Sequence, residues 1–433
     1  LSWSWGHFGW FGQDRWRRGS WTLLLGLRHD FDTLPTQYVE RDYNNVQPRV
    51  GLSYGFANGR GVLRSGFGIF HDAKRIPAHW IMADRVLGWG VETPLWDLRP
   101  FNRRTGAIAF RSLVGPPVAA PAFYTLLQRG EFPVASQGSI WVHPFQRDLR
   151  TPYSEQASLE LEYEIASGWT ISASYLFVHG LKLPVMGGNL NAFRTGTAAD
   201  GRPLFAGRRD PRFLNVLPVF NGDRSNYNGG TFSVKKRFSR GFSFTANYTV
   251  SKTISLRDPQ GWGLDIAQQP NDPTNENLER GLSNQHVGQR FVGTFLGEGP
   301  RQRWRGLLRD FRLGVIVTAE GPRYFTVFAG VDANQDGNPG PDRPGQLGKN
   351  TFKGDRYVDV SLRVSRAIAV GERLRLEAIW EIFNLFNTVN IRNFNTVWGS
   401  ADLNTPPPPI LRYGSPRDVF NPRQMQFAMK IAF

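Results

Sequence analysis

Cysteine and long apolar runs are both missing from this chain of 433 residues. Without cysteine, the protein can form no disulfide, thiolate nucleophile, iron–sulfur cluster or cysteine zinc site. This composition suits the reducing cytosol, but it also suits a periplasm-facing protein that avoids wrong disulfides. No apolar run reaches the roughly 18 residues of a membrane-spanning helix, and the mean hydropathy is -0.38. A bundle of membrane helices is therefore excluded.

Acidic residues are few relative to basic ones: 36 Asp and Glu stand against 52 Lys and Arg, a net charge of +16. A basic excess can indicate nucleic-acid binding, but these basic residues are dispersed along the chain. We therefore expect no nucleic-acid partner. The hydrophobic share of 40% is too high for a disordered chain.

Apolar and polar residues alternate with a period of two along much of the chain. Leu159 and Leu161, for example, alternate with Glu160 and Glu162. A helix would scatter these side chains around its circumference, whereas a strand places them on opposite faces. The pattern predicts about thirteen strands, at residues 8–16, 21–31, 48–56, 61–71, 154–165, 169–179, 229–238, 242–252, 286–296, 308–319, 357–367, 373–383 and 425–433.

The connections between these strands alternate between short and long. Meandering antiparallel strands put alternate connections at opposite ends of a sheet, so the tight turns share one end and the long loops the other. This is the layout of an outer-membrane barrel with short periplasmic turns and long external loops. The predicted fold is all-β, an antiparallel up-and-down transmembrane β-barrel in a single domain, 1–433. Long external loops are predicted at about 32–47, 72–153, 180–228, 253–285, 320–356 and 384–423.

Charged residues gather on one face of the predicted strands. Near the membrane midplane, each charge in contact with lipid would cost several kcal/mol, so this face is predicted to line a wet lumen. A soluble antiparallel sheet with a solvated polar face is the alternative. The predicted lumen-facing charges are Arg28, Arg49, Arg64, Glu160, Glu162, Arg363 and Glu377.

The odd number of strands carries a further expectation. If the chain ends on the periplasmic side, thirteen strands place its beginning outside, whereas closed bacterial barrels have an even number and both ends in the periplasm. We therefore expect the front part of a larger barrel to be absent from this chain. Such a piece would form an open, curved sheet, or a strained closure with poor pairing between 8–16 and 425–433.

The last predicted strand alternates apolar residues and closes on an aromatic one. This ending resembles the recognition signal for the outer-membrane barrel assembly machinery, which we therefore expect as a partner. An ordinary amphipathic edge strand is the alternative. The residues of the predicted assembly signal are Phe427, Met429, Ile431 and Phe433.

One loop matches the start of a calcium-binding loop, D-x-[DN]-x-[DN]-G. Oxygen ligands at alternate positions around a glycine turn suit a hard cation. The bidentate Glu expected at the twelfth position is replaced by Arg343, and Asp342 can substitute only with altered geometry. Calcium in the 332–342 loop is one interpretation; an Asp- and Asn-rich external loop without a cofactor is the other. The candidate ligands are Asp332, Asn334, Asp336 and Asn338.

Motifs of catalysis are missing from the sequence. The seven His residues form no HExxH pair, and no G-x-S-x-G elbow occurs. Glu160 and Glu162 have a spacing that could mimic a glycosidase dyad, but in the predicted barrel they are charges that face the lumen. We expect no enzymatic activity and no catalytic residue.

Several segments together point to a known family. They are 45–54 (NVQPRVGLSY) followed by 62–72, then 151–156, 248–252, 280–283 and 381–387 (EIFNLFN). In this order they resemble TonB-dependent outer-membrane receptors of the Oar-like group, whose members usually carry an N-terminal carboxypeptidase-regulatory-like domain. The resemblance runs over nearly the whole chain, and the ordered set is more specific than any one segment.

The resemblance implies a 22-stranded barrel occluded by an N-terminal plug. The chain would be its C-terminal part, with nine strands, the plug, the TonB box and the regulatory-like domain absent. It also implies a Gram-negative outer membrane, a TonB complex acting through the plug, and transport of an unidentified external ligand. A plug-free porin-like channel, an adhesion or protein-secretion barrel, and a secreted soluble β-enzyme acting on polysaccharide are the alternatives.

Overall fold

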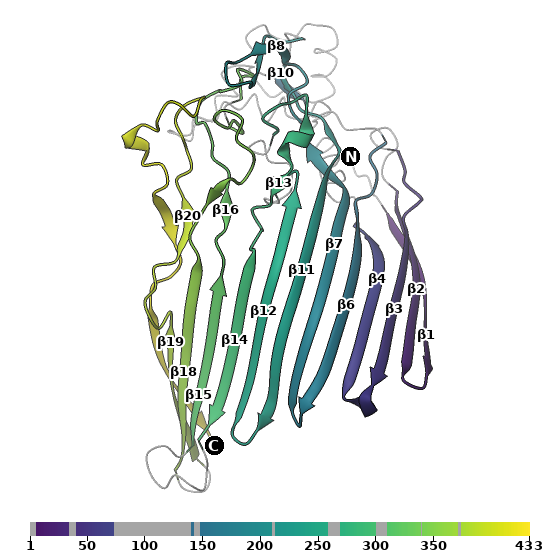
Figure 1. Cartoon of the computed structure of the whole chain (residues 1–433), viewed down its shortest axis with the longest axis vertical. Coiled ribbons are helices and arrows are strands. Elements are labelled where there is room, and N and C mark those ends of the chain that lie inside the picture. Colours follow the sequence, from purple (N-terminus) through teal and green to yellow (C-terminus); the bar gives the residue numbers. More distant parts are fainter. Residues whose placement is uncertain are drawn as a thin grey trace.

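The computed structural model describes residues 6–33, 40–72, 140–142, 148–209, 213–258, 269–299, 310–338, 340–370 and 374–433. Thirteen strands in these residues form one antiparallel sheet and follow each other in chain order (Figure 1). A short strand, β13 (Gly281–Leu282), pairs with β12 beside this path. The thirteen strands are β1 (His7–Arg18), β2 (Trp21–Asp32), β3 (Val46–Phe56), β4 (Gly61–His71), β6 (Tyr153–Ala166), β7 (Trp169–Met186), β11 (Val219–Ser239), β12 (Phe242–Ser255), β14 (Gln289–Glu298), β15 (Phe311–Glu320), β18 (Tyr357–Val370), β19 (Leu374–Phe383) and β22 (Gln424–Ala432).

Each of the thirteen predicted strands is confirmed, but β7 and β11 are longer than predicted. Their pairing continues to Met186 and Val219, so much of the predicted 180–228 connection is strand. The register shifts on both sides of Asp223 in this extension. A bulge inserts an extra residue and breaks the period of two, which is why alternation did not reveal the extension.

The long connections contain four small two-stranded sheets that the sequence did not predict. Their strands have only two to five residues, too few for alternation to show. Most of the predicted 72–153 loop lies outside the described residues. The pairs are β5 (Ile140–Val142) with β10 (Phe213–Val216), β8 (Phe193–Thr197) with β9 (Pro203–Ala206), β16 (Tyr324–Phe325) with β17 (Phe352–Lys353), and β20 (Ile391–Phe394) with β21 (Pro416–Val419).

Tight turns join consecutive strands at one end of the sheet, which we call the turn end. In the β6–β7 and β11–β12 turns, Gly168 and Gly241 have φ of +75° and +86°, values that strain a residue with a Cβ atom. The long connections lie at the opposite end, which we call the loop end (Figure 1).

The sheet is curved and open. Among the described residues, β1 pairs only with β2 and β22 only with β19, so no ladder joins the first strand to the last. The residues of both edge strands are exposed throughout. The expectation of an open, curved sheet is therefore confirmed.

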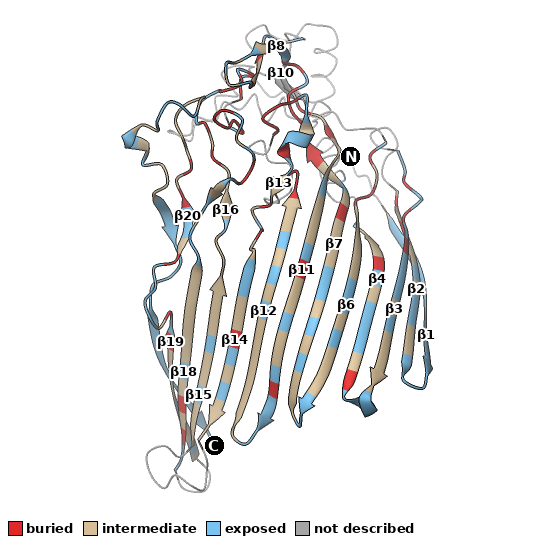
Figure 2. Ribbon diagram, viewed as in Figure 1, coloured by how far each residue is buried: buried red, intermediate tan, exposed pale blue. Residues whose placement is uncertain are grey.

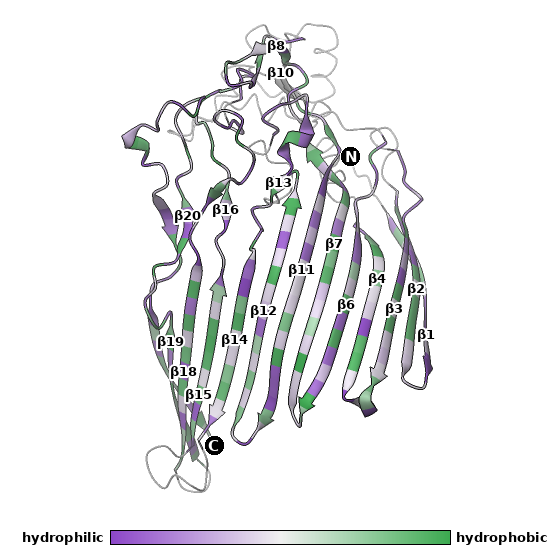
Figure 3. Ribbon diagram, in the orientation of Figure 1, coloured by the Kyte–Doolittle hydropathy of each residue, from purple (hydrophilic) through white to green (hydrophobic). Residues whose placement is uncertain are grey.

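The pairing register places the polar residues of all thirteen strands on the same face of the sheet. Residues opposite each other on neighbouring strands share a face, as Arg64 does with Glu160 and Arg363 with Glu381. Figure 3 shows hydrophilic and hydrophobic residues alternating along the strands. The opposite face is mainly apolar, and Leu159 and Phe232 on it are 50% and 65% exposed. An apolar face of this size, uncovered by protein, suits contact with lipid.

The buried residues concentrate at the loop end, where the long connections pack against each other (Figure 2). Val185, Phe205, Leu217, Val327 and Ala329 are each at most 3% exposed. We call the described parts of connections 187–218, 256–288, 321–356 and 384–423 the loop cap. No helix in the described residues is long and apolar enough to cross a membrane.

Candidate functional site

Backbone hydrogen bonds join connections of the loop cap that are far apart in the sequence. The Phe205 N–H donates to the Asn334 carbonyl over 2.8 Å, and the Phe328 N–H donates to the Thr396 carbonyl over 3.0 Å. The connection after β15 thus contacts both the one after β7 and the one after β19. The cap is a single structural unit.

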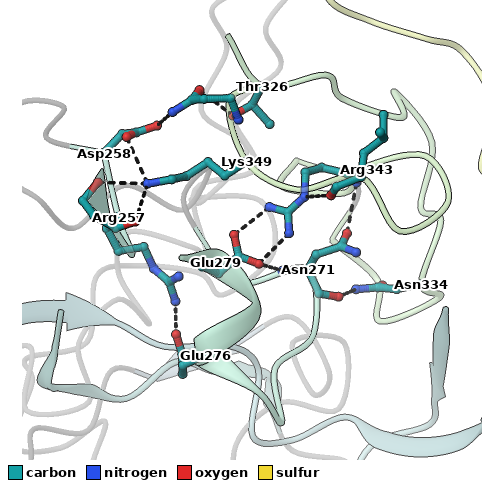
Figure 4. Close-up of polar contacts among 12 residues, drawn as sticks. Arg257, Asp258, Asn271, Glu276, Glu279, Thr326, Asn334, Arg343 and Lys349 are labelled. Atoms are coloured by element: carbon teal, nitrogen blue, oxygen red, sulfur yellow. Dashed lines mark hydrogen bonds and ion pairs between the residues drawn. The ribbon is translucent and has the colours of Figure 1, made fainter. Parts of the chain in front are cut away.

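A buried ion pair fastens the connection after β12 to the one after β15 (Figure 4). The Arg343 Nη1 and Nη2 atoms each lie 2.6 Å from an Oε atom of Glu279, with the two side chains 5% and 3% exposed. Burial acts to raise the pKa of Glu279, but the two bonds from the Arg343 guanidinium outweigh burial and hold this pKa below its ordinary value. Glu279 is therefore a buried carboxylate that depends on Arg343.

Two further ion pairs lie beside this one. Lys349 Nζ is 3.1 Å from Asp258 Oδ1, and Arg257 pairs with Glu276 (Figure 4). Asn350 donates from Nδ2 to Asp258 Oδ2 over 2.7 Å. Burial lowers the pKa of Lys349 although Asp258 raises it, so desolvation dominates there. These residues were not predictable from the sequence, because the partners are distant in the chain and carry no local pattern.

A pocket of about 740 Å³ opens beside this network, between the connections after β12, β15 and β19. Its lining includes six basic and three acidic side chains together with aromatic rings. Basic side chains and aromatic faces suit a ligand that is anionic and partly planar. The basic side chains are Arg257, Arg323, Arg343, Lys349, Arg392 and Arg417; the aromatic ones are Tyr324, Phe325, Phe328, Phe394 and Phe420.

The four predicted calcium ligands lie together in the connection between β15 and β18. Asn334, Asp336 and Asn338 are buried, at 0%, 2% and 8% exposed, and the Gly337 N–H donates to Asp332 Oδ2 over 2.9 Å. The Arg343 side chain, at the mismatched twelfth position, is held by Glu279 instead. Within the described part of the chain, no three His, Cys, Asp or Glu side chains converge closely enough to hold a metal ion.

The seven predicted lumen charges all lie on the polar face of the sheet, as the strand registers show. Most have charged partners on that face. Arg64 lies 3.3 Å from Glu160 and 3.7 Å from Glu162, so the two glutamates share one counterion. Their position in a lumen stays a prediction. The other partners are Asp30 for Arg28, Glu381 for Arg363 and Arg312 for Glu377, while Arg49 stacks over Phe70.

The predicted assembly signal lies at the open edge of the sheet. Phe427, Met429 and Ile431 of β22 are 76%, 66% and 51% exposed, and Phe433 is fully exposed at 100%. The Phe427 ring stacks on Trp380 of β19 with 5.7 Å between ring centroids. These residues are accessible along one face, and their recognition by assembly machinery stays a prediction.

Comparison with solved structures supports the same fold. The ferric enterobactin receptor PfeA of Pseudomonas aeruginosa, as a mutant in complex with enterobactin, is 14% identical with a TM-score of 0.52 over 98% of this chain and 45% of that one. P. aeruginosa FpvA bound to heterologous pyoverdines is 12% identical with a TM-score of 0.51 over 98% and 38%. The chain thus spans less than half the length of these receptors. No curated protein matches it in sequence.

The outer membrane beta barrel domain family matches residues 33–347 and 338–426. That match covers most of the chain, and it agrees with the antiparallel sheet and its exposed apolar face. The protein therefore resides in the outer membrane of a Gram-negative bacterium. The chain belongs to the outer membrane beta barrel domain family.

Proposed function

We propose that this chain is the C-terminal part of a TonB-dependent receptor of the Oar-like group. The sheet forms part of the barrel wall, the loop cap faces outward and binds a ligand, and a plug encoded upstream gates the pore. The ligand then moves across the outer membrane by coupling to TonB, without enzymatic chemistry. The family match and the fold shared with PfeA and FpvA support this proposal.

The pocket of the loop cap is the observation that carries the proposal. A passive pore needs no binding site built at its mouth, whereas a receptor must hold its ligand before transport. Here the pocket wall is anchored by the Arg343–Glu279 and Lys349–Asp258 pairs, which fix its shape. In the proposed orientation, the polar face lines the lumen and the apolar face meets lipid and lipopolysaccharide. The assembly machinery recognises β22 and the Phe433 that follows it.

Reconstitution of the complete gene product tests energy coupling against passive diffusion. Purified from the outer membrane and placed in liposomes, it is expected to give no swelling in arabinose, because a plug closes the barrel. It is also expected to bind the purified periplasmic domain of TonB in a pull-down. The control is a version lacking the segment upstream of this chain, which should not bind TonB. Swelling in arabinose without TonB binding would instead establish a porin-like channel.

From the basic side chains of the pocket we also expect the ligand to be anionic. Pyrene tetrasulfonate, an anionic aromatic probe, should bind the protein in detergent micelles, and neutral pyrenemethanol should bind less. Replacing both Arg392 and Arg417 by glutamine is expected to weaken binding of the sulfonate about tenfold, since two such charge contacts together contribute about 1–2 kcal/mol. Fluorescence anisotropy measures both affinities.

The matched control is Arg312→Gln, because Arg312 pairs with Glu298 on neighbouring strands away from the pocket. This variant should bind the sulfonate like the unmodified protein. Equal weakening by the control and by the pocket variant would mean that the dye responds to net charge alone, and would contradict an anion site in the pocket.

A further inference from the structure

The described residues of the 332–342 loop, 332–338 and 340–342, contact each other through their own polar side chains. The Asp336 N–H donates to Asn334 Oδ1 over 2.9 Å, and the Asn338 N–H donates to Asp336 Oδ1 over 2.7 Å. Gly337 has φ of +89°, a conformation that favours glycine. Side-chain oxygens of Asn334 and Asp336 therefore accept hydrogen bonds from the backbone of the same short segment. Taken alone, this geometry occurs in many loops rich in Asp and Asn.

Asp342 supplies an independent observation that points to a ligand. The side chain is 0% exposed, and its Oδ2 accepts hydrogen bonds from the N–H groups of Ala333 and Asn334, over 2.6 and 3.0 Å. The carboxylate thus lies against the first turn of the loop. Its Oδ1 is buried and has no hydrogen-bond partner. Buried polar atoms without a partner are uncommon and costly, so this oxygen calls for a bound cation or another donor.

Nearby positive charge does not neutralise these carboxylates. Arg202 and Arg208 reach the loop, but they donate to the carbonyl oxygens of Ala333 and Asp336, over 2.7 and 2.9 Å. Neither arginine therefore forms an ion pair with a carboxylate in the described residues of the loop.

We propose that Asp342 completes a calcium site together with Asp332, Asn334 and Asp336. It takes the place of the acidic residue that such loops usually have one position later. In the described residues these three carboxylates do not converge closely enough to hold a metal ion, so binding requires them to draw together around it. Calcium accepts six to eight oxygen ligands in flexible geometry, and amide and backbone carbonyl oxygens of the loop supplement the carboxylates. An affinity of about 10⁻⁴–10⁻³ M is expected, as for extracellular calcium modules.

Calcium bound here would stiffen the roof of the pocket. Asn334 donates from Nδ2 to the Asn271 carbonyl over 3.1 Å, and Asn338 donates from Nδ2 to Gln269 Oε1 over 2.9 Å. Gln269 and Pro341 both line the pocket. Ordering of the 332–342 loop by the ion would therefore also fix the position of residues that line the pocket.

Isothermal titration of the complete gene product, purified in detergent micelles, tests the proposal. After removal of divalent ions with EGTA, the protein is titrated with calcium chloride and, separately, with magnesium chloride. One calcium per chain is expected, with weaker binding of magnesium. Asp342→Asn should weaken calcium binding at least tenfold. Asp355→Asn removes an exposed carboxylate from the same connection and should leave binding unchanged.

The Asp342→Asn variant also separates a metal ligand from a merely structural residue. Its amide oxygen can accept the same two N–H groups, so without calcium it should melt at the same temperature as the unmodified chain or higher. Only the calcium-dependent rise in melting temperature should be lost. If this variant does not fold, Asp336→Asn takes its place with the same expected weakening. Absence of calcium binding by the unmodified chain, or equal binding by the variant, would overturn the proposal.

Discussion

Replacing Arg343 by alanine is expected to lower the free energy of local unfolding of the loop cap by about 3–5 kcal/mol. The substitution leaves Glu279, which is 2% exposed, as a buried carboxylate without its counterion. Water from the adjoining pocket can enter the vacated space, but it does not supply the positive charge that the guanidinium gave to Glu279. Hydrogen exchange of the backbone amides in 269–286, measured in detergent micelles, reports the local unfolding free energy.

Arg363→Ala is the matched control for this loss. Arg363 pairs with Glu381 over 3.0 Å, but its side chain is 53% exposed, so the cost should be about 1 kcal/mol or less. Replacing Arg343 by methionine and Glu279 by leucine together should recover most of the stability, because no unpaired charge remains. Similar losses for Arg343→Ala and Arg363→Ala would show that burial does not strengthen the first pair.

The effect of Arg343→Ala should also depend on pH. In the unmodified protein the pKa of Glu279 lies below its ordinary value of 4.5, with burial opposed and exceeded by the Arg343 bonds. The pair therefore contributes stability above pH 4.5, and this contribution is lost as pH falls through the lowered pKa. The difference between the two proteins should thus shrink as pH falls below 4.5.

Leu159→Arg is expected to destabilise the folded sheet in a membrane by about 2–4 kcal/mol. Leu159 lies midway along β6, is 50% exposed, and has Ser65 and Tyr175 as its cross-strand partners on the apolar face. Lipid covers this face in the proposed orientation, and an arginine there loses its hydration. Urea unfolding of the protein in phospholipid vesicles, followed by tryptophan fluorescence, measures the change.

Ser158→Arg tests the same strand on its other face. Ser158 is exposed and lines a hollow of about 630 Å³ on the polar face with Arg64, Gly66 and Glu160. An arginine there can reach water and Glu160, so a change within about 1 kcal/mol is expected. A larger loss for Ser158→Arg than for Leu159→Arg would reverse the assignment of the two faces.

The strands were predictable because their signal is local. Successive residues of a strand point to opposite faces, so one apolar and one polar environment leave a period of two in segments such as 157–165. The same rule placed all seven charged residues on one face. Alternation did not reveal the extension of β7 and β11, because the bulges around Asp223 interrupt the period of two. It also did not reveal the strands of two to five residues within the connections, because they are too short to show a period.

The loop cap was not predictable in the same way. Glu279 and Arg343 are 64 residues apart, and neither lies in a periodic segment. Their pairing follows from how the connections of neighbouring strands fold over the same end of the sheet. The sequence did mark residues 332–342 through their Asp and Asn spacing. It did not show that Arg343 turns to Glu279 while Asp342 turns to the loop.

Alternating side chains by themselves determined an antiparallel sheet of thirteen strands with one polar and one apolar face, because each strand carries that information in its own residues. Only the tertiary structure decided which long connections meet, which charges are buried together, and where a pocket opens. The physical reason is that burial and ion pairing depend on distances in space between segments far apart in the chain. A local sequence pattern carries no information about those distances.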